Sequence, residues 1–454
     1  MNKNLKVFKK WFLFLAAVLL IIFAFTACAG DLPEIPREEL LGTEPGIETP
    51  VEEDNPQNTE AVSATVSGQV VDSVSGDFLS CFVNVKSETI KTTNYITDIV
   101  GRFSFRLEIG IYEIKFFRDV EYEIKEITVE IKNRLPQKFA PLKLTKLYDV
   151  RSLDYRSVDL HQHSTFSDGI DPPVDVYMAN LAAGLDYGVL SDHNTVDGQK
   201  EWQEIKHKNF LAVNGIEVTS DAKGHFNVIN TDKLYNWRIT TPDAMKASVE
   251  SAKSDSTFVQ INHPSRYDIL GLAYWELIDC FEGIEVWNGK DVVPTQGGSN
   301  KNAKDKWYEL LSQGIRLTAT AGADNHQINA PSFTGTPRTY VTVDEFTVDA
   351  MIKALKAGRC FISNGPVIEA KINGKSFGET VSPGGYTLGL KAFSNEKLTK
   401  ITILKNGEPI KTVSADQLVC ADNYAVTLSA GDFITIEVEA VNGGFALCNP
   451  IFCE

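Results

Sequence analysis

Apolar and polar residues alternate in short runs over residues 64–147, which is the pattern of β-strands that bury only one face. Turn-forming residues, such as Ser75-Gly76-Asp77, separate the runs. The predicted strands cover residues 66–71, 82–86, 102–107, 112–117 and 122–131. This pattern predicts a small all-β sandwich.

Residues 148–365 follow a different pattern, in which apolar runs alternate with helical segments. Two of the predicted helices carry a proline in their first turn, at Pro172 and Pro242. Two more cover residues 301–313 and 347–357, and each is followed by a glycine. The apolar runs cover residues 187–190, 210–218, 257–261, 283–287 and 315–319. Repeated strand–helix units predict either a parallel barrel or a doubly wound sheet.

After Pro366 the short-strand pattern returns, with Asn-Gly turns at Asn373-Gly374 and Asn406-Gly407. Residues 366–454 are therefore predicted to form a second β-module. The chain as a whole is predicted to be multidomain, with the strand–helix domain flanked by two small all-β sandwich modules.

The N-terminus has the pattern of an export signal. Four lysines among the first ten residues precede an uncharged apolar run of 17 residues that ends at Ala27, so residues 1–27 are predicted to be a signal peptide. The following Cys28 lies in a segment that resembles a bacterial lipobox, except that Phe25 stands where leucine is expected. We therefore expect lipidation of Cys28 and a lipid-anchored, extracytoplasmic protein at a bacterial cell membrane. The alternative is an uncleaved single-span anchor, for which 17 residues is at the short limit.

Acidic residues dominate the rest of the chain. Residues 28–63 hold ten acidic side chains and five prolines without an aromatic residue, which predicts a solvated tether. The formal net charge of the chain is −16, and removal of the four lysines in residues 1–27 makes it −20. Such a surface repels phosphate backbones, so we expect no nucleic-acid binding unless bound metal ions reverse the field locally.

Six cysteines follow Cys28, and none of them forms a CxxC motif. One disulfide among Cys420, Cys448 and Cys453 is compatible with an exported protein. Buried free thiols are the alternative.

Candidate chemistry is concentrated in residues 148–365, where six of the seven histidines lie at or beyond the ends of predicted strands. His161 and His163 are two residues apart on one strand, so both side chains face the same side and can bind one ion. The other predicted ligands are Asp168, His193, Glu217, His225, His263, Asp324 and His326. Because the carboxyl ends of strands in such folds form one rim, we expect all nine to meet there.

Each of these histidines alone is better explained as a strand cap, but six histidines joined by three acidic residues indicate a metal centre. Nine nitrogen and oxygen donors exceed the needs of one ion, so two or three divalent ions are predicted. Imidazole and carboxylate without thiolate suit manganese, iron or zinc. The seventh histidine, His207, lies on a predicted polar helix over residues 203–208 and is expected to be solvated.

The ordered motifs HxH, SDG, SDHN, GIE, GH, NHP and ADNH resemble those of the PHP (polymerase and histidinol phosphatase) superfamily. They are most similar to its exported branch named after carbaryl hydrolase, which shares the string GIEVWNG at residues 283–289. The resemblance covers about residues 155–365 and implies a distorted (β/α)7 barrel and metal-dependent hydrolysis, usually of phosphate esters. It also implies the following ligand sets: His161, His163, Glu217 and Asp324 for one ion, Glu217, His225 and His263 for a second, and Asp168, His193 and His326 for a third. Some relatives carry histidine in place of Asp168.

A second resemblance concerns residues 64–147. The segments 68–72, 97–105 and 110–112 are similar to the carboxypeptidase-regulatory-like fold, which is common in exported proteins and implies no catalysis.

Three further residues are candidates for catalysis. Asp192 could orient an imidazole, or it could cap a strand end. Arg338 and Arg266 could each clamp a phosphoryl oxygen, or each could form a surface ion pair. Glu285 and Trp287 could point one into the barrel and one onto the rim, or both could simply pack.

These features predict an exported multinuclear metallohydrolase. A hydroxide that bridges two ions about 3.5–4 Å apart can form near neutral pH and attack phosphorus, so a phosphomonoester or phosphodiester is the favoured substrate. The carbaryl-hydrolase resemblance makes carbamate or carboxylic esters the first alternative. A cell-surface binding lipoprotein is the second, in which the β-modules contact glycan or cell wall and the barrel only holds metal. The substrate is expected to be a small molecule or a cell-envelope ester.

Overall fold

The computed structural model describes residues 62–88, 92–266, 270–289, 293–328 and 334–454. The predicted signal peptide, Cys28 and nearly all of the tether lie outside these ranges. Residues 61–454 form one compact unit. Within the described ranges, the helices are all too short or too polar to cross a membrane.

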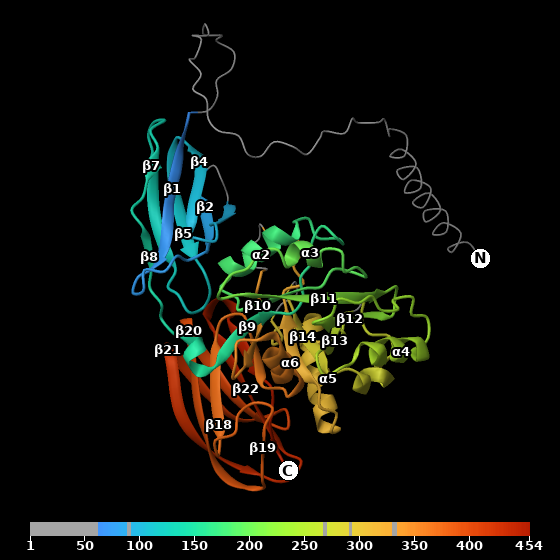
Figure 1. The fold of residues 1–454 in the computed structure, drawn as a ribbon. Coiled ribbons are helices and arrows are strands. Elements are labelled where there is room, and N and C mark those ends of the chain that lie inside the picture. The colour runs from blue at the N-terminus through green and yellow to red at the C-terminus, as the bar shows by residue number, and fades with distance from the viewer. Residues whose placement is uncertain (1–61, 89–91, 267–269, 290–292, 329–333) are drawn as a thin grey trace, which may run out of the picture. The chain divides into compact units, whose positions relative to one another are not determined.

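The first part of this unit contains two four-stranded sheets (Figure 1). In β4 every second side chain is buried, as the alternating sequence predicts, and these apolar side chains share a core with β5 of the other sheet. The first sheet consists of β1 (Ser63–Asp72), β4 (Arg102–Glu108), β7 (Gln137–Lys138) and β8 (Leu142–Leu144). The second consists of β2 (Phe82–Lys86), β3 (Thr93–Ile96), β5 (Gly110–Phe117) and β6 (Lys125–Ile131). The likeness to carboxypeptidase-regulatory-like domains stays a prediction.

Seven strands of the middle region lie side by side in chain order. They are β9 (Tyr155–Asp159), β10 (Tyr187–Leu190), β11 (Leu211–Ser220), β12 (Gly224–Ile229), β13 (Phe258–Asn262), β14 (Gly283–Asn288) and β15 (Thr318–Gly322). A bridge between Gln162 and Asn325 joins the segments that follow the first and the last of these strands.

The arrangement is parallel except at β12, which is antiparallel to both neighbours. Of the two predicted arrangements, a wholly parallel barrel is therefore wrong at this strand. Only residues 221–223 separate β11 from β12, and so short a connection can join only antiparallel strands.

Helices occupy several of the connections, with α2 (Pro173–Ala182), α3 (Gln199–Trp202), α4 (Pro242–Ala252), α5 (Gly298–Ser312) and α6 (Val348–Lys356) as the α-helices. The hydroxyl of Thr241 accepts a hydrogen bond from the Ala244 amide at the start of α4, as an N-cap does. Short 3₁₀ turns are η1 (Val150–Leu153), η2 (Trp275–Cys280) and η3 (Val441–Gly443). The helix predicted over residues 203–208 is wrong, because α3 ends at Trp202 and the half-buried His207 lies in a turn.

The C-terminal strands continue the sheet of the middle region. β16 (Arg338–Thr342) pairs with β9, and β17 (Cys360–Ser363) pairs with β16. The sheet then continues through β23 (Phe445–Cys448), β22 (Phe433–Ala440), β20 (Gly384–Lys405) and β18 (Val367–Ile372). The remaining strands are β19 (Thr380–Val381), β21 (Glu408–Leu428) and β24 (Ile451–Cys453).

The two predicted Asn-Gly turns are confirmed, since Asn373, Gly374, Asn406 and Gly407 all have positive φ. The expectation of uniformly short strands is wrong, because β20 has 22 residues and β21 has 21. The six cysteines of the described chain are free thiols, and all except the half-buried Cys280 are buried, in agreement with the second alternative.

Candidate metal centre

The structure brings all nine predicted ligands together. His161, His163 and Asp168 follow β9, and His193 follows β10, while Glu217 and His225 lie on β11 and β12. His263 follows β13, and Asp324 and His326 follow β15. Their ligand atoms form four overlapping groups, each within 4.8 Å. The groups are His163 with Asp168, His193 and His326; His161 with His163 and Asp324; His161 with Glu217 and His263; and His193 with Glu217 and His225.

Glu217 is the centre of the buried part of this site. Its carboxylate is fully buried and lies among five imidazoles. Oε1 is 3.3 Å from His161 Nε2, 3.2 Å from His225 Nδ1 and 3.4 Å from His263 Nε2. Oε2 is 2.9 Å from His193 Nδ1 and 3.5 Å from His163 Nε2. One carboxylate is thus placed to be shared between neighbouring cations.

Asp324 adds a second buried carboxylate. Its Oδ1 lies 3.2 Å from His163 Nε2 and 3.6 Å from His161 Nε2. Because His161 and His163 thus face both Asp324 and Glu217, the HxH pair connects the two carboxylates.

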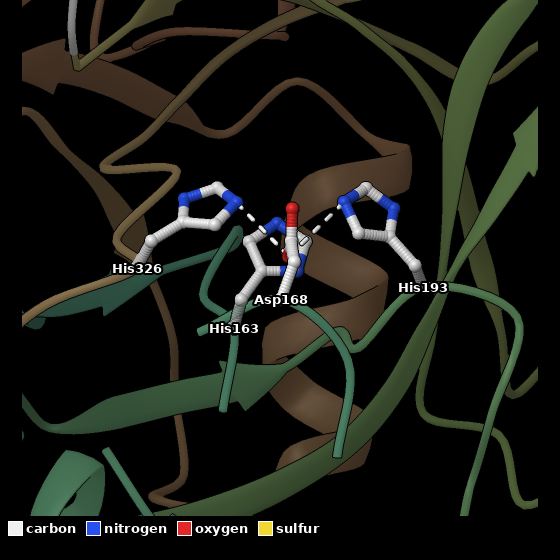
Figure 2. Close-up of side chains that lie close together, drawn as sticks. All are labelled: His163, Asp168, His193 and His326. Carbon is white, nitrogen blue, oxygen red and sulfur yellow. Dashed lines mark ion pairs between the residues drawn. The ribbon is translucent and has the colours of Figure 1, made fainter. Parts of the chain in front are cut away.

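Asp168 lies on the open side of the site, where its side chain is 57% exposed. Its Oδ1 is 3.1 Å from His326 Nε2, 3.5 Å from His193 Nε2 and 3.9 Å from His163 Nδ1. Figure 2 shows the carboxylate between the rings of His326 and His193, with His163 beside it. The accessible side of the centre is therefore the one that contains Asp168.

The charges of these groups depend on one another. Burial alone would raise the pKa of Glu217, but the surrounding imidazoles hold it well below its usual range. Burial alone would lower the pKa of His193, but Glu217 and Asp168 raise it to about 10. Hydrogen bonds from His193 and His326 lower the pKa of Asp168. In the absence of a cation the cluster therefore retains protons, and metal binding would release them.

The unpaired atoms of the cluster show that the residues fit divalent metal ions. Among the described residues, seven buried atoms of the cluster have no hydrogen-bond partner: His161 Nε2, Nδ1 and Nε2 of both His163 and His225, His263 Nδ1, and Glu217 Oε2. Leaving a buried polar group unpaired costs about 1–3 kcal/mol, so this number is too large to leave without ligands. Imidazole nitrogens and carboxylate oxygens without thiolate match divalent transition metals.

Asp192 does not orient an imidazole in this structure. Its buried carboxylate accepts hydrogen bonds of 2.7 Å from the Ser164 amide, the Ser164 hydroxyl and the Ser167 hydroxyl. The residue therefore holds the loop that carries Asp168.

Two residues that support the ligands were missed by the sequence patterns, and a third, Glu285, was singled out without a defined role. Glu285 Oε1 lies 3.0 Å from His161 Nδ1, Asn262 donates to Glu217 Oε1 at 2.8 Å, and Asn288 donates to Asp324 Oδ2 at 3.1 Å. All three lie in the last four residues of β13 or β14. Their position at the ends of predicted strands was the sequence signal that could have identified them. Trp287, by contrast, packs against the ring of Phe445.

The two arginine candidates lie close to the chain segments of the site. Arg338 is buried at the start of β16, and its Nε donates to the Gly335 carbonyl at 2.7 Å. The amide of Arg266 donates to the His263 carbonyl at 3.2 Å. A catalytic role for either arginine stays a prediction.

Comparison with known proteins gives only partial matches. No family model matches the chain. A 5'-3' exoribonuclease of Haemophilus influenzae is 31% identical over 84 residues, which is 18% of this chain and 31% of the exoribonuclease. The chain thus matches about a third of that enzyme.

Solved structures with some similarity include a two-domain protein from Bacteroides vulgatus that contains a predicted PHP-like metal-dependent phosphoesterase. It is 19% identical, with a TM-score of 0.38, and the match covers 65% of this chain and 95% of that one. Endonuclease Q of Pyrococcus furiosus is 13% identical, with a TM-score of 0.31 and coverage of 44% and 56%. An amidohydrolase from Chromobacterium violaceum is 18% identical, with a TM-score of 0.26 and coverage of 37% and 87%. All three TM-scores are below 0.5, a level that establishes neither fold nor function.

Proposed function

We propose that this protein is a multinuclear metal-dependent hydrolase that cleaves phosphomonoesters or phosphodiesters. The observation that carries the proposal is the position of Glu217, a buried carboxylate within 3.5 Å of ring nitrogens from five histidines. So many buried imidazoles without partners would destabilise the fold if they had only a structural role, because no interaction would compensate for their burial.

The chain would hold its ions in the three ligand sets that the PHP resemblance implies, with Glu217 shared between two of them. When bound, divalent ions supply a hydroxide near neutral pH and offset the charge of phosphoryl oxygens. The buried faces of His161, His225 and His263 exclude water from one side of the centre. The exposed Asp168 side, together with the half-buried His193 and His326, leaves room for an ester to approach.

The wider architecture is part of the same proposal. Strands β9 to β15 and their helices would form the distorted (β/α)7 barrel, and the all-β parts at residues 64–147 and 366–454 would contact glycan or cell wall. The similarity to the carbaryl-hydrolase branch makes carbamate and carboxylic esters the competing substrates.

Metal analysis paired with a substrate panel tests the function. Purified protein would be loaded separately with manganese, iron and zinc, and its metal content measured. It would then be assayed on p-nitrophenyl phosphate, bis-p-nitrophenyl phosphate, a p-nitrophenyl carboxylate, an aryl carbamate, and short RNA and DNA. We expect two or three ions per chain and turnover of a phosphate ester.

Each other outcome of the panel has a definite meaning. Turnover of only the carboxylate or carbamate would replace the phosphoesterase assignment. Cleavage of RNA or DNA alone would overturn the expectation drawn from the acidic surface. Full metal content without any turnover would favour the surface-binding lipoprotein.

We further propose that the protein is exported and anchored through a lipid on Cys28. In a bacterial host the wild type should partition with membranes and carry a lipid, while Cys28→Ser should be released or misprocessed with normal metal content. Equal membrane association of both proteins, with no lipid on the wild type, would indicate the uncleaved anchor instead.

A further inference from the structure

Glu285 is a fully buried carboxylate on β14 that is not among the nine ligands. Its Oε1 lies 3.0 Å from His161 Nδ1. Its Oε2 accepts hydrogen bonds from the His263 amide at 2.8 Å and from Asn288 Nδ2 at 3.2 Å. Both oxygens are therefore in contact with polar groups, and the two contacts of Oε2 are with N–H donors.

The contact with His161 fixes which ring nitrogen can bind a metal. A carboxylate can only accept hydrogen bonds, so the proton of the imidazole stays on Nδ1. The other nitrogen, Nε2, then faces Glu217 at 3.3 Å and Asp324 at 3.6 Å, so it is the nitrogen that can bind a cation once its own proton is released. This is the arrangement in which a carboxylate orients a metal-binding histidine.

The second oxygen acts on two more ligands. His263 has a φ of 28°, a left-handed conformation that is unfavourable for a residue other than glycine, and Glu285 binds the amide of that residue. Asn288 donates to Glu285 and also to Asp324 Oδ2 at 3.1 Å. One carboxylate thereby connects His161, His263 and Asp324.

The backbone leaves space for this contact at Gly322 of β15. A Cβ atom at this position would lie 2.5 Å from His161 Cβ and 3.0 Å from Glu285 Oε1. Even an alanine would therefore displace His161 or Glu285.

We infer that Glu285 is a positioning residue, which holds His161, His263 and Asp324 in the geometry that binds metal. The inference rests on the proposed function, because it assumes that these three residues are ligands. It assigns to Glu285 a role in metal affinity without direct contact to the ion.

The test is Glu285→Gln, compared with Glu282→Gln in the full chain. Glutamine keeps the volume, but its NH2 group would face at least one of the donors that Glu285 now accepts. We expect about a 10–100-fold loss of zinc affinity, measured by competition with a chelator. Glu282 directly precedes β14 and binds Lys356 and the Val259 amide, away from the nine ligands, so Glu282→Gln should bind zinc as the wild type does.

A second measurement uses the wild type alone, in case Glu285→Gln does not fold. In the zinc-loaded protein, long-range ¹H–¹⁵N spectra should show His161 protonated at Nδ1 and metal-bound at Nε2. Unchanged zinc affinity in a folded Glu285→Gln, or a His161 protonated at Nε2, would overturn the inference. A wild type that binds no metal would instead refute the proposed function itself, so the two failures are distinguishable.

Discussion

Glu217 and Glu285 are both fully buried carboxylates in one site, yet their surroundings differ in kind. The donors around Glu285 are satisfied by its two oxygens, as expected of a structural group. Glu217 faces ring nitrogens of which several have no hydrogen-bond partner among the described residues. An unsatisfied set of lone pairs around a buried carboxylate needs a cation, whereas a satisfied set does not. This difference identifies Glu217 as a metal ligand and Glu285 as a residue that positions ligands.

Replacing Glu217 with glutamine tests that distinction. Glu217→Gln keeps the side-chain volume but removes the negative charge that offsets two adjacent dications, so metal content should fall and turnover should drop by orders of magnitude. Metal analysis and rates on the substrate panel measure the two effects. His207→Ala is the folded control, because His207 lies outside the four ligand groups. Full metal content and near-normal rates in Glu217→Gln would show that the multinuclear assignment is wrong.

The sequence predicted which nine residues would form the metal centre, but not which residues would hold them in position. Histidines and acidic residues at the ends of strands could be assigned to one rim of the sheet. The period of a strand and the direction of the chain can both be read from the local sequence. The partner of Asp192 could not be predicted in this way, since its contacts with Ser164 and Ser167 come from a loop 25 to 28 residues away. The same applies to Glu285, which reaches across 124 residues to His161.

At the scale of elements, strands with clear alternation or strong apolar character were predicted closely, such as residues 187–190 and 82–86. β12 was missed although polar and apolar residues alternate over residues 225–228, because so short a run does not identify a strand until its neighbours are known. The lengths of β20 and β21 were also missed. Most residues of β21 are exposed, and from the sequence alone such a polar segment resembles a loop.

The loop that carries Asp168 should depend on Asp192. Asp192→Ala removes all three hydrogen bonds to Ser164 and Ser167, so Asp168 would lose its fixed position at the open side. We expect metal content to fall by about one ion per chain while the buried ligands around Glu217 keep theirs. Metal analysis after dialysis measures this change.

The matched control is Asp197→Ala, which alters an exposed aspartate in the turn five residues later. It should bind as many ions as the wild type. The loop interpretation fails if Asp192→Ala retains the wild-type number of ions, or if it loses all of them.

At the scale of the whole unit, the C-terminal strands support β15, the strand that Asp324 and His326 follow. The side chain of Asn449 is buried, and it binds the backbone of Ala319 on β15 in both directions, at 2.8 and 2.9 Å. The hydroxyl of Tyr308 on α5 lies 3.0 Å from that of Thr435 on β22. These contacts join residues after 366 to the elements of the site, in addition to the shared sheet.

A nearly buried ion pair of Lys304 on α5 with Glu437 on β22 also joins these parts. The two charged atoms are 2.6 Å apart, and each side chain is 10% exposed. Removing one partner leaves an uncompensated charge with little access to water, so Glu437→Gln should lower the free energy of unfolding by about 3 kcal/mol. Replacing both residues with apolar ones, Lys304→Met with Glu437→Leu, should recover most of that loss, because neither charge is then buried. Denaturant unfolding of Lys304→Met, of Glu437→Leu and of the double variant measures the coupling.

Glu309→Gln is the control on the same helix, because Glu309 forms an exposed pair with Lys306 that water and salt screen. Its unfolding midpoint should match that of the wild type. Metal content should stay at the wild-type level in every folded variant, since neither Lys304 nor Glu437 belongs to the ligand groups. A Glu437→Gln protein as stable as the wild type would mean that water reaches the pair and that this contact does not hold the C-terminal strands to α5.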